Sequence, residues 1–208
     1  MLTFYYAPWS RASSVLWLLE EIGQPYDIEL VDIRASGGVP EEYRKIQPNK
    51  KVPAVVHDGT VITERAAISI YLADRFPQAG LAPAPDSAER AAYLTWLVYS
   101  DSVYDPVVAA KAHGHDFMGA GFSYGSFDEM VANLEKTLQS RPYIAGDTFT
   151  AADVQIASGI RYGLDTLHLL PERPVFRAYL ERVSTRPAFG RASETDYGYA
   201  RQMGMTGE

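Results

Sequence analysis

The pattern of apolar and polar positions divides the chain into two parts with different kinds of element. In residues 1–77, short apolar runs alternate with longer stretches in which apolar residues recur every three or four positions. Short runs favour strands, and the longer spacing favours helices. The run 2–7 predicts a first strand. A helix follows and ends at Gly23; its apolar positions are Val15, Leu18, Leu19 and Ile22.

The rest of this first part predicts three more strands and a closing helix. The stretch "YDIELVDI" predicts a second strand, and "VPAVVHDGTVI" predicts two strands joined at Asp58-Gly59, a dipeptide typical of tight hairpins. The stretch "ERAAISIYLADRF" predicts a helix that ends before Pro77. Elements in this order form a small mixed sheet with helices on its faces.

The second part of the chain predicts helices and no strand. Residues 78–86 are rich in proline and predict a linker, and residues 87–208 predict an all-helical domain. Pro106 is expected to kink a long helix, and Pro187 is expected to close the last one. A glycine-containing loop is expected from Gly114 to Gly125.

Two short segments of this part have the spacing of a capping box, in which a hydroxyl residue and an acid three positions later satisfy each other's backbone at a helix start. Ser126–Glu129 is one such segment, and Thr150–Asp153 is the other. Each predicts the start of a helix.

The composition excludes several classes of protein and several kinds of chemical site. With 47% hydrophobic and 22% charged residues, the 208-residue chain is typical of a globular protein. A formal net charge of −7 argues against nucleic-acid binding, which needs a basic face. The absence of cysteine excludes disulfides, thiolate metal sites and a cysteine nucleophile. No membrane span or signal peptide is evident, so we expect a cytoplasmic protein without membrane partners.

Three segments, taken in order, resemble the cytosolic glutathione S-transferase superfamily of the bacterial type. "PNKKVPAVVHDG" and "ITERAAISIYLADRF" are similar to two glutathione-binding segments of that family, and "FTAADVQIAS" resembles a buried capping box of its helical domain. The resemblance implies an α/β thioredoxin-like domain with the order β-α-β-α-β-β-α over residues 1–77. An all-α substrate-binding bundle would follow over residues 87–208.

The resemblance also implies which residues hold glutathione. Val52 would pair through its backbone with the cysteinyl part of the tripeptide, since a cis Pro53 turns that peptide outward. Thr63 would cap the next helix, whose positive end would face the γ-glutamyl carboxylate, and Glu64 would face the ammonium group. Arg65 stands where the family usually has serine or threonine, so the usual hydroxyl contact is lost. Its backbone N–H can still serve, and its guanidinium could add a carboxylate contact.

Two further cations are expected at the glutathione site, and no metal. Lys51 matches a position that in some members meets the glycyl carboxylate, and Arg34 lies where a basic residue can approach glutathione. His113 and His115 form a His-x-His pair, but the sequence around them offers no third ligand.

The turn "WSRAS" after the first strand is the expected place of thiol activation. Lowering the pKa of a thiol by about 2 units from about 8.5 requires roughly 2.7 kcal/mol of preferential thiolate stabilisation. In the family a Tyr, Ser or Cys near this place contributes to that stabilisation. Ser10 is the first candidate donor, Ser13 and Tyr6 are alternatives, and Arg11 could stabilise a thiolate by charge. Ser10 could equally serve only as a helix cap.

The resemblance implies an enzyme of detoxification that binds glutathione, stabilises its thiolate and conjugates it to small electrophilic hydrophobic substrates. It also implies a homodimer. Two alternatives stay open. One is a non-catalytic ligand-binding or regulatory member of the same fold. The other is a glutathione-dependent isomerase, which is disfavoured because "WSRAS" lacks the Ser-Ser-Cys turn of the maleylacetoacetate isomerases.

Overall fold

The computed structural model describes residues 1–115 and 121–205, and the chain divides into two compact units. The first unit comprises Met1–Ala79 together with Arg186–Glu208, and the second comprises Gly80–Thr185. In the described ranges, no helix combines the length and the apolar character needed to cross a membrane.

The division between the units differs from the expected domain ranges at the C-terminal end of the chain. The helical domain was expected over residues 87–208, but residues 186–208 cluster with the first unit. The reason is a final helix, α8, which the sequence pattern did not predict.

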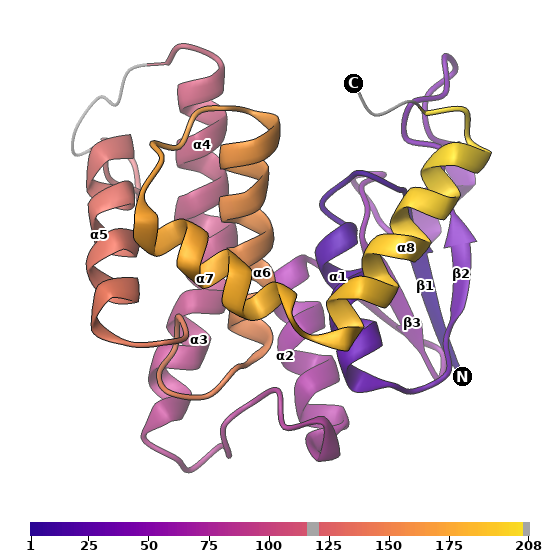
Figure 1. The fold of residues 1–208 in the computed structure, drawn as a ribbon. Helices are drawn as coiled ribbons and strands as arrows, with labels where there is room; N and C mark the ends of the chain where they lie inside the picture. The colour runs from indigo at the N-terminus through magenta and orange to yellow at the C-terminus, as the bar shows by residue number, and fades with distance from the viewer. Residues whose placement is uncertain (116–120, 206–208) are drawn as a thin grey trace. The chain divides into compact units, whose positions relative to one another are not determined.

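The first unit is built on a four-stranded mixed sheet in the order β2-β1-β3-β4 (Figure 1). β1 runs parallel to β2 and antiparallel to β3, and β4 pairs antiparallel with β3. The predicted hairpin between β3 and β4 is confirmed, and both of its turn residues, Asp58 and Gly59, have positive φ (47° and 82°). The strand bounds are Leu2–Tyr6 for β1, Asp27–Leu30 for β2, Ala54–His57 for β3 and Thr60–Thr63 for β4.

Helices cover this sheet. The predicted end of the first helix, α1, at Gly23 is confirmed, since Gly23 has φ 67° and its N–H donates to the carbonyl of Leu19. The second helix of the expected β-α-β-α-β-β-α order is present only as a short 3-10 helix, η1. The helix bounds in this unit are Ser13–Ile22 for α1, Glu41–Lys45 for η1, Arg65–Arg75 for α2, Pro77–Ala79 for the 3-10 helix η2 and Pro187–Gln202 for α8.

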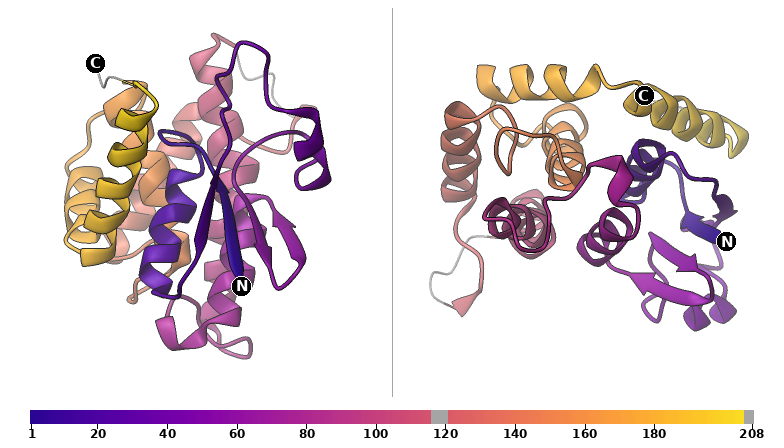
Figure 2. Two further views of the ribbon diagram at one scale, coloured as in Figure 1. Left: turned by 90° about the vertical axis from the view of Figure 1, so that its right-hand side faces the viewer. Right: turned by 90° about the horizontal axis from the view of Figure 1, so that it is seen from below.

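The predicted helix does end before Pro187, as α7 (Pro174–Ser184), but it is not the last helix, because Pro187 opens a further helix, α8. Proline lacks an amide hydrogen, and the first position of a helix does not need one. α8 lies along α1 (Figures 1 and 2). Arg186 forms a two-bond ion pair with Glu21 of α1, with both N–O distances 2.7 Å.

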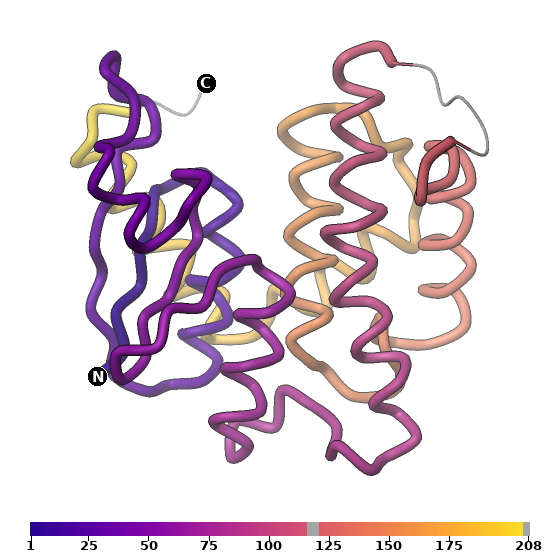
Figure 3. The backbone as a smooth tube through the Cα atoms, turned by 180° about the vertical axis from the view of Figure 1, so that it is seen from behind, coloured from indigo at the N-terminus to yellow at the C-terminus, as the bar shows by residue number. Residues whose placement is uncertain are grey.

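The second unit is a helical bundle. Its chain path runs from α3 through a π-helical turn into α4 without changing direction (Figure 3). Pro106, expected to kink a long helix, lies in the first turn of α4 directly after that π-helical turn. The element bounds are Glu89–Tyr99 for α3, Ser100–Tyr104 for the π-helical turn, Asp105–Ala112 for α4, Phe127–Ser140 for α5, Ala151–Arg161 for α6, Tyr162–Thr166 for a second π-helical turn and Pro174–Ser184 for α7.

Part of the expected loop from Gly114 to Gly125 lies outside the described residues, since 116–120 are not described. Both predicted capping boxes are confirmed. Ser126 and Glu129 satisfy each other's backbone at the start of α5. At the start of α6 the carboxylate of Asp153 is fully buried and accepts from the N–H of Thr150 at 2.9 Å.

Candidate functional site

The strand register brings three segments that are distant in sequence to one edge of the sheet. Tyr5 near the end of β1 pairs with Ala54 at the start of β3, and Ala54 pairs in turn with Thr63 at the end of β4. The residues that follow β1, precede β3 and follow β4 therefore meet at this edge. They are the "WSRAS" turn, the Val52–Pro53 peptide and the start of α2.

The Val52–Pro53 peptide bond is cis, as the family resemblance implied. In the described part of the chain, no hydrogen bond occupies the backbone N–H of Val52. The residue before it is held on both sides, because the N–H of Lys51 donates to Gln47 at 3.1 Å and the hydroxyl of Tyr43 donates to the Lys51 carbonyl at 3.0 Å. A firmly placed peptide with an open N–H can pair with an extended ligand.

The start of α2 differs from the expectation in one detail. The prediction that Thr63 caps this helix is wrong, because Thr63 belongs to β4 and the capping position is Glu64. Glu64 has φ 66°, a left-handed conformation that side chains rarely adopt and that is found preferentially at functional sites. Arg65, the first residue of α2, is buried with 6% of its surface exposed.

The side chain of Ser10 makes two hydrogen bonds within the turn. Its hydroxyl donates to the carbonyl of Ala7 at 2.7 Å and accepts from the N–H of Ala12 at 3.0 Å. The helix begins three residues later at Ser13, and its capping residue, Ala12, has no side-chain cap. Ser10 is thus a turn residue, and its hydroxyl can donate to a ligand only by rotating away from Ala7.

The other candidates for thiol activation are placed very differently. Arg11 is half-buried, and the hydroxyl of Ser13 is enclosed by protein without a partner in the described residues. Tyr6 is fully buried, and its hydroxyl donates to the carboxylate of Asp196. Burial and the adjacent Asp196 carboxylate raise the pKa of Tyr6 well above its ordinary value. An enclosed, neutral hydroxyl that is already donating cannot reach a thiolate, so Tyr6 is not a candidate in this fold.

Arg34 contacts the turn itself. Its guanidinium donates to the carbonyl of Trp9 at 2.9 Å and to the carbonyl of Pro8 at 3.2 Å. The N–H of Trp9 donates to Asp196 of α8 at 3.1 Å. Sequence reasoning missed Asp196 because it missed α8. The available signal was Pro187, whose fixed φ suits the first turn of a helix.

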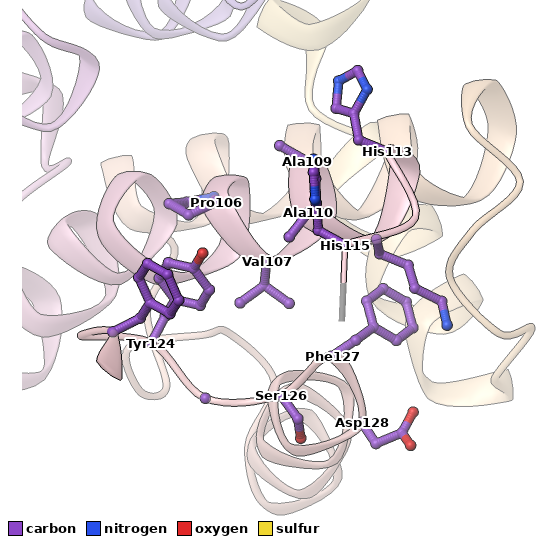
Figure 4. Close-up of a pocket in the computed structure, with 13 residues that line it drawn as sticks. Pro106, Val107, Ala109, Ala110, His113, His115, Tyr124, Ser126, Phe127 and Asp128 are labelled. Carbon is purple, nitrogen blue, oxygen red and sulfur yellow. The ribbon is translucent and has the colours of Figure 1, made fainter. Parts of the chain in front are cut away.

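A separate cavity of about 550 Å³ lies in the helical unit between α4 and α5 (Figure 4). It contains none of the expected glutathione-binding residues. Most of its lining is apolar, and His113, His115 and Lys111 add polar groups to the wall. In residues 1–115 and 121–205, no group of three or more His, Asp or Glu side chains is placed to hold a metal ion.

Comparison with known proteins identifies the family. The family model of the glutathione S-transferase N-terminal domain matches residues 8–75, and that of the C-terminal domain matches residues 125–187. Glutathione S-transferase 3 of Schizosaccharomyces pombe is 31% identical, over 93% of this chain and 87% of that protein. The disulfide-bond oxidoreductase YfcG of Escherichia coli is 27% identical, over 92% of this chain and 94% of that protein.

A solved structure supports the same family assignment. A sphingomonad glutathione S-transferase complexed with glutathione matches with a TM-score of 0.76 and 26% identity, covering 93% of this chain and 98% of that one. The chain therefore belongs to the glutathione S-transferase superfamily. The expected fold class, a thioredoxin-like α/β unit and a helical bundle, is confirmed.

Proposed function

We propose that this protein is a glutathione transferase that binds the tripeptide at the sheet edge described above and activates its thiol at the turn after β1. The observation that carries the proposal is the convergence, through the strand register, of the open N–H of Val52, the start of α2 and the Ser10 turn.

Each part of glutathione finds a complementary group at this edge. The cysteinyl backbone pairs with Val52, the ammonium group faces the carboxylate of Glu64, and the γ-glutamyl carboxylate meets the positive end of α2 beside Arg65. The exposed ammonium of Lys51 lies next to Val52 in the chain and suits the glycyl carboxylate. We assign no direct ligand contact to Arg34, because its guanidinium already donates to two carbonyls of the turn.

The chemistry requires only orientation and stabilisation of a thiolate. The thiol proton leaves to solvent, and the sulfur lone pair forms a bond to the electrophilic carbon. The electron pair of the bond that breaks departs with a leaving group or moves into the substrate. The Ser10 hydroxyl donates a hydrogen bond to the thiolate in place of Ala7, and the charge of Arg11 adds to this stabilisation.

One observation favours a second candidate function, a non-catalytic ligand-binding member of the family. The open cavity between α4 and α5 is lined largely by apolar side chains such as Val107, Phe122 and Phe127. Pockets of about this volume commonly bind small apolar molecules.

Replacement of the turn residues tests the proposal. Ser10→Ala should raise the pKa of bound glutathione and lower kcat/KM with a generic aryl electrophile by more than about tenfold, equivalent to about 1.4 kcal/mol. Ser87→Ala is the matched control, because the Ser87 hydroxyl makes a similar local bond to the N–H of Glu89 in the helical unit. It should change neither quantity. A far larger loss in Arg11→Ala with a silent Ser10→Ala would transfer the donor role to Arg11.

The same assays distinguish the proposed function from the alternative functions. Glutathione binding without turnover of any electrophile would support the ligand-binding alternative. Turnover of a disulfide instead, in which two glutathione molecules reduce one disulfide to two thiols and form glutathione disulfide, would place the protein with the oxidoreductase among its relatives.

A further inference from the structure

The backbone of Trp9, directly before Ser10, is held by two groups of opposite charge. Trp9 has φ 50°, in the left-handed region that is unfavourable for a bulky side chain. Asp196 accepts from the Trp9 N–H at 3.1 Å, and Arg34 donates to the Trp9 carbonyl at 2.9 Å. A residue in such a conformation persists only where the surrounding structure holds it there.

Asp196 is itself firmly placed. It lies in α8, whose start is joined to α1 by the Arg186–Glu21 ion pair. The same oxygen, Oδ1, that accepts from Trp9 also accepts from the buried Tyr6 hydroxyl. The carboxylate therefore links the turn to both α8 and the core of the sheet.

We propose that Asp196 is a positioning residue for thiol activation: its carboxylate holds Trp9 in the left-handed conformation and thereby places the hydroxyl of Ser10. This inference rests on the proposed glutathione transferase function. Ser10 follows Trp9 directly, so a rotation of Trp9 to an ordinary negative φ displaces the Ser10 side chain. Misplacement of a reacting group by about 1 Å can cost up to about 100-fold in rate.

The role depends on the hydrogen-bond acceptor and not on the charge. A carboxylate close to the sulfur would disfavour the thiolate by repulsion, and the guanidinium of Arg34, which is bonded to the Trp9 carbonyl, offsets that field. Both hydrogen bonds to Asp196 end on one oxygen, so the amide oxygen of an asparagine can accept both. Asp196→Asn therefore retains the positioning, and Asp196→Ala removes it.

The test compares Asp196→Ala and Asp196→Asn with Arg191→Ala, a matched control that also removes two hydrogen bonds between α8 and the rest of the first unit. Calorimetry measures glutathione affinity, ultraviolet absorbance against pH measures the thiol pKa of bound glutathione, and steady-state kinetics with an aryl electrophile measures kcat and KM. Asp196→Ala should raise the thiol pKa and lower kcat by about tenfold with little change in glutathione affinity. Asp196→Asn should restore most of kcat, and Arg191→Ala should lower only the melting temperature.

An unchanged thiol pKa and kcat in Asp196→Ala, or an equal change in Arg191→Ala, would overturn the inference. If Asp196→Ala does not fold, hydrogen exchange of the Trp9 amide in the unmodified protein decides. Protection is expected, and exchange at the rate of an unstructured peptide would overturn the positioning role. Failure of the unmodified protein to bind glutathione would refute the proposed function itself. Binding with a lowered thiol pKa that Asp196→Ala leaves unaltered would refute only the role of Asp196.

Discussion

Loss of the Asp153 carboxylate is expected to destabilise the helical unit far more than loss of an ordinary helix cap. Asp153 is fully buried. It accepts from the N–H of Ile144 at 2.7 Å, from the hydroxyl of Tyr179 at 2.9 Å and from the N–H of Thr150 at 2.9 Å. Asp153→Ala leaves these three donors buried and unpaired. Each such donor costs about 1–3 kcal/mol, and relaxation of the neighbours favours the lower end of that range. The free energy of unfolding should therefore fall by about 3 kcal/mol or more.

The matched control is the second capping box of the same unit. Glu129 forms the same reciprocal bonds with Ser126 at the start of α5, but in an exposed position, so Glu129→Ala should cost only about 1 kcal/mol. Thermal unfolding followed by circular dichroism should give a decrease in Tm of roughly 6–12 °C for Asp153→Ala, at about 2–4 °C per kcal/mol for a chain of this size. Asp153→Asn keeps the oxygen that faces Ile144 and Tyr179. Its decrease in Tm should therefore lie between those of Asp153→Ala and Glu129→Ala. Equal decreases for Asp153→Ala and Glu129→Ala would refute the reasoning.

Four further measurements test other parts of the account. Lys51→Ala should raise the Kd for glutathione about threefold to tenfold with kcat unchanged, since an exposed charged contact contributes only about 1 kcal/mol; an unchanged Kd would contradict the glycyl contact. Arg186→Ala leaves Glu21, whose side chain is 5% exposed, without its ion-pair partner at the start of α8; we expect the free energy of unfolding in urea to fall by about 2–4 kcal/mol, and a fall below about 0.5 kcal/mol would contradict this expectation. Burial raises the pKa of Asp153 to about 6, so the folded protein holds this proton more tightly than the unfolded chain. The resulting stability is present below about pH 4 and is lost as the pH rises through about 6. The stability gap between the unmodified protein and Asp153→Asn should thus be wider at about pH 4 than at about pH 7, and an equal gap would contradict the shift. The homodimer implied by the family resemblance predicts twice the chain mass in light scattering after size exclusion, and a monomer would contradict it.

Local chemistry made much of the fold predictable from the sequence. Asp58-Gly59 favours a tight hairpin wherever strands flank it, and Gly23 accommodates the left-handed φ that ends α1. The capping boxes at Ser126 and Thr150 need only a hydroxyl and an acid three residues later. These features depend on a few neighbouring residues, so the sequence pattern is sufficient to locate them.

The elements that sequence reasoning missed depend on distant contacts. The buried residues of α8, such as Ala188 and Ala192, are small and give only a weak apolar pattern. Its attachment to α1 uses charged residues instead, and the ion-pair partner of Arg186 lies 165 positions away in the chain. Nothing local in the sequence signals such a pair.

The same limitation affects the candidate site. The segments around Val52 and Glu64 could be found from the family resemblance, but the left-handed φ of Glu64 could not, because only surrounding structure holds a side chain in that conformation. The exclusion of Tyr6 likewise required the position of Asp196. The order of elements in the first 77 residues was accessible from sequence, and the contacts of α8 with the turn that follows β1 were not.

A crystal structure of the protein soaked with glutathione tests the central claim most directly. The account predicts that the cysteinyl backbone of the tripeptide pairs with the N–H of Val52 and that its sulfur lies within hydrogen-bond distance of the Ser10 hydroxyl or the Arg11 guanidinium. A tripeptide bound elsewhere, or with its sulfur directed away from the turn that follows β1, would contradict it.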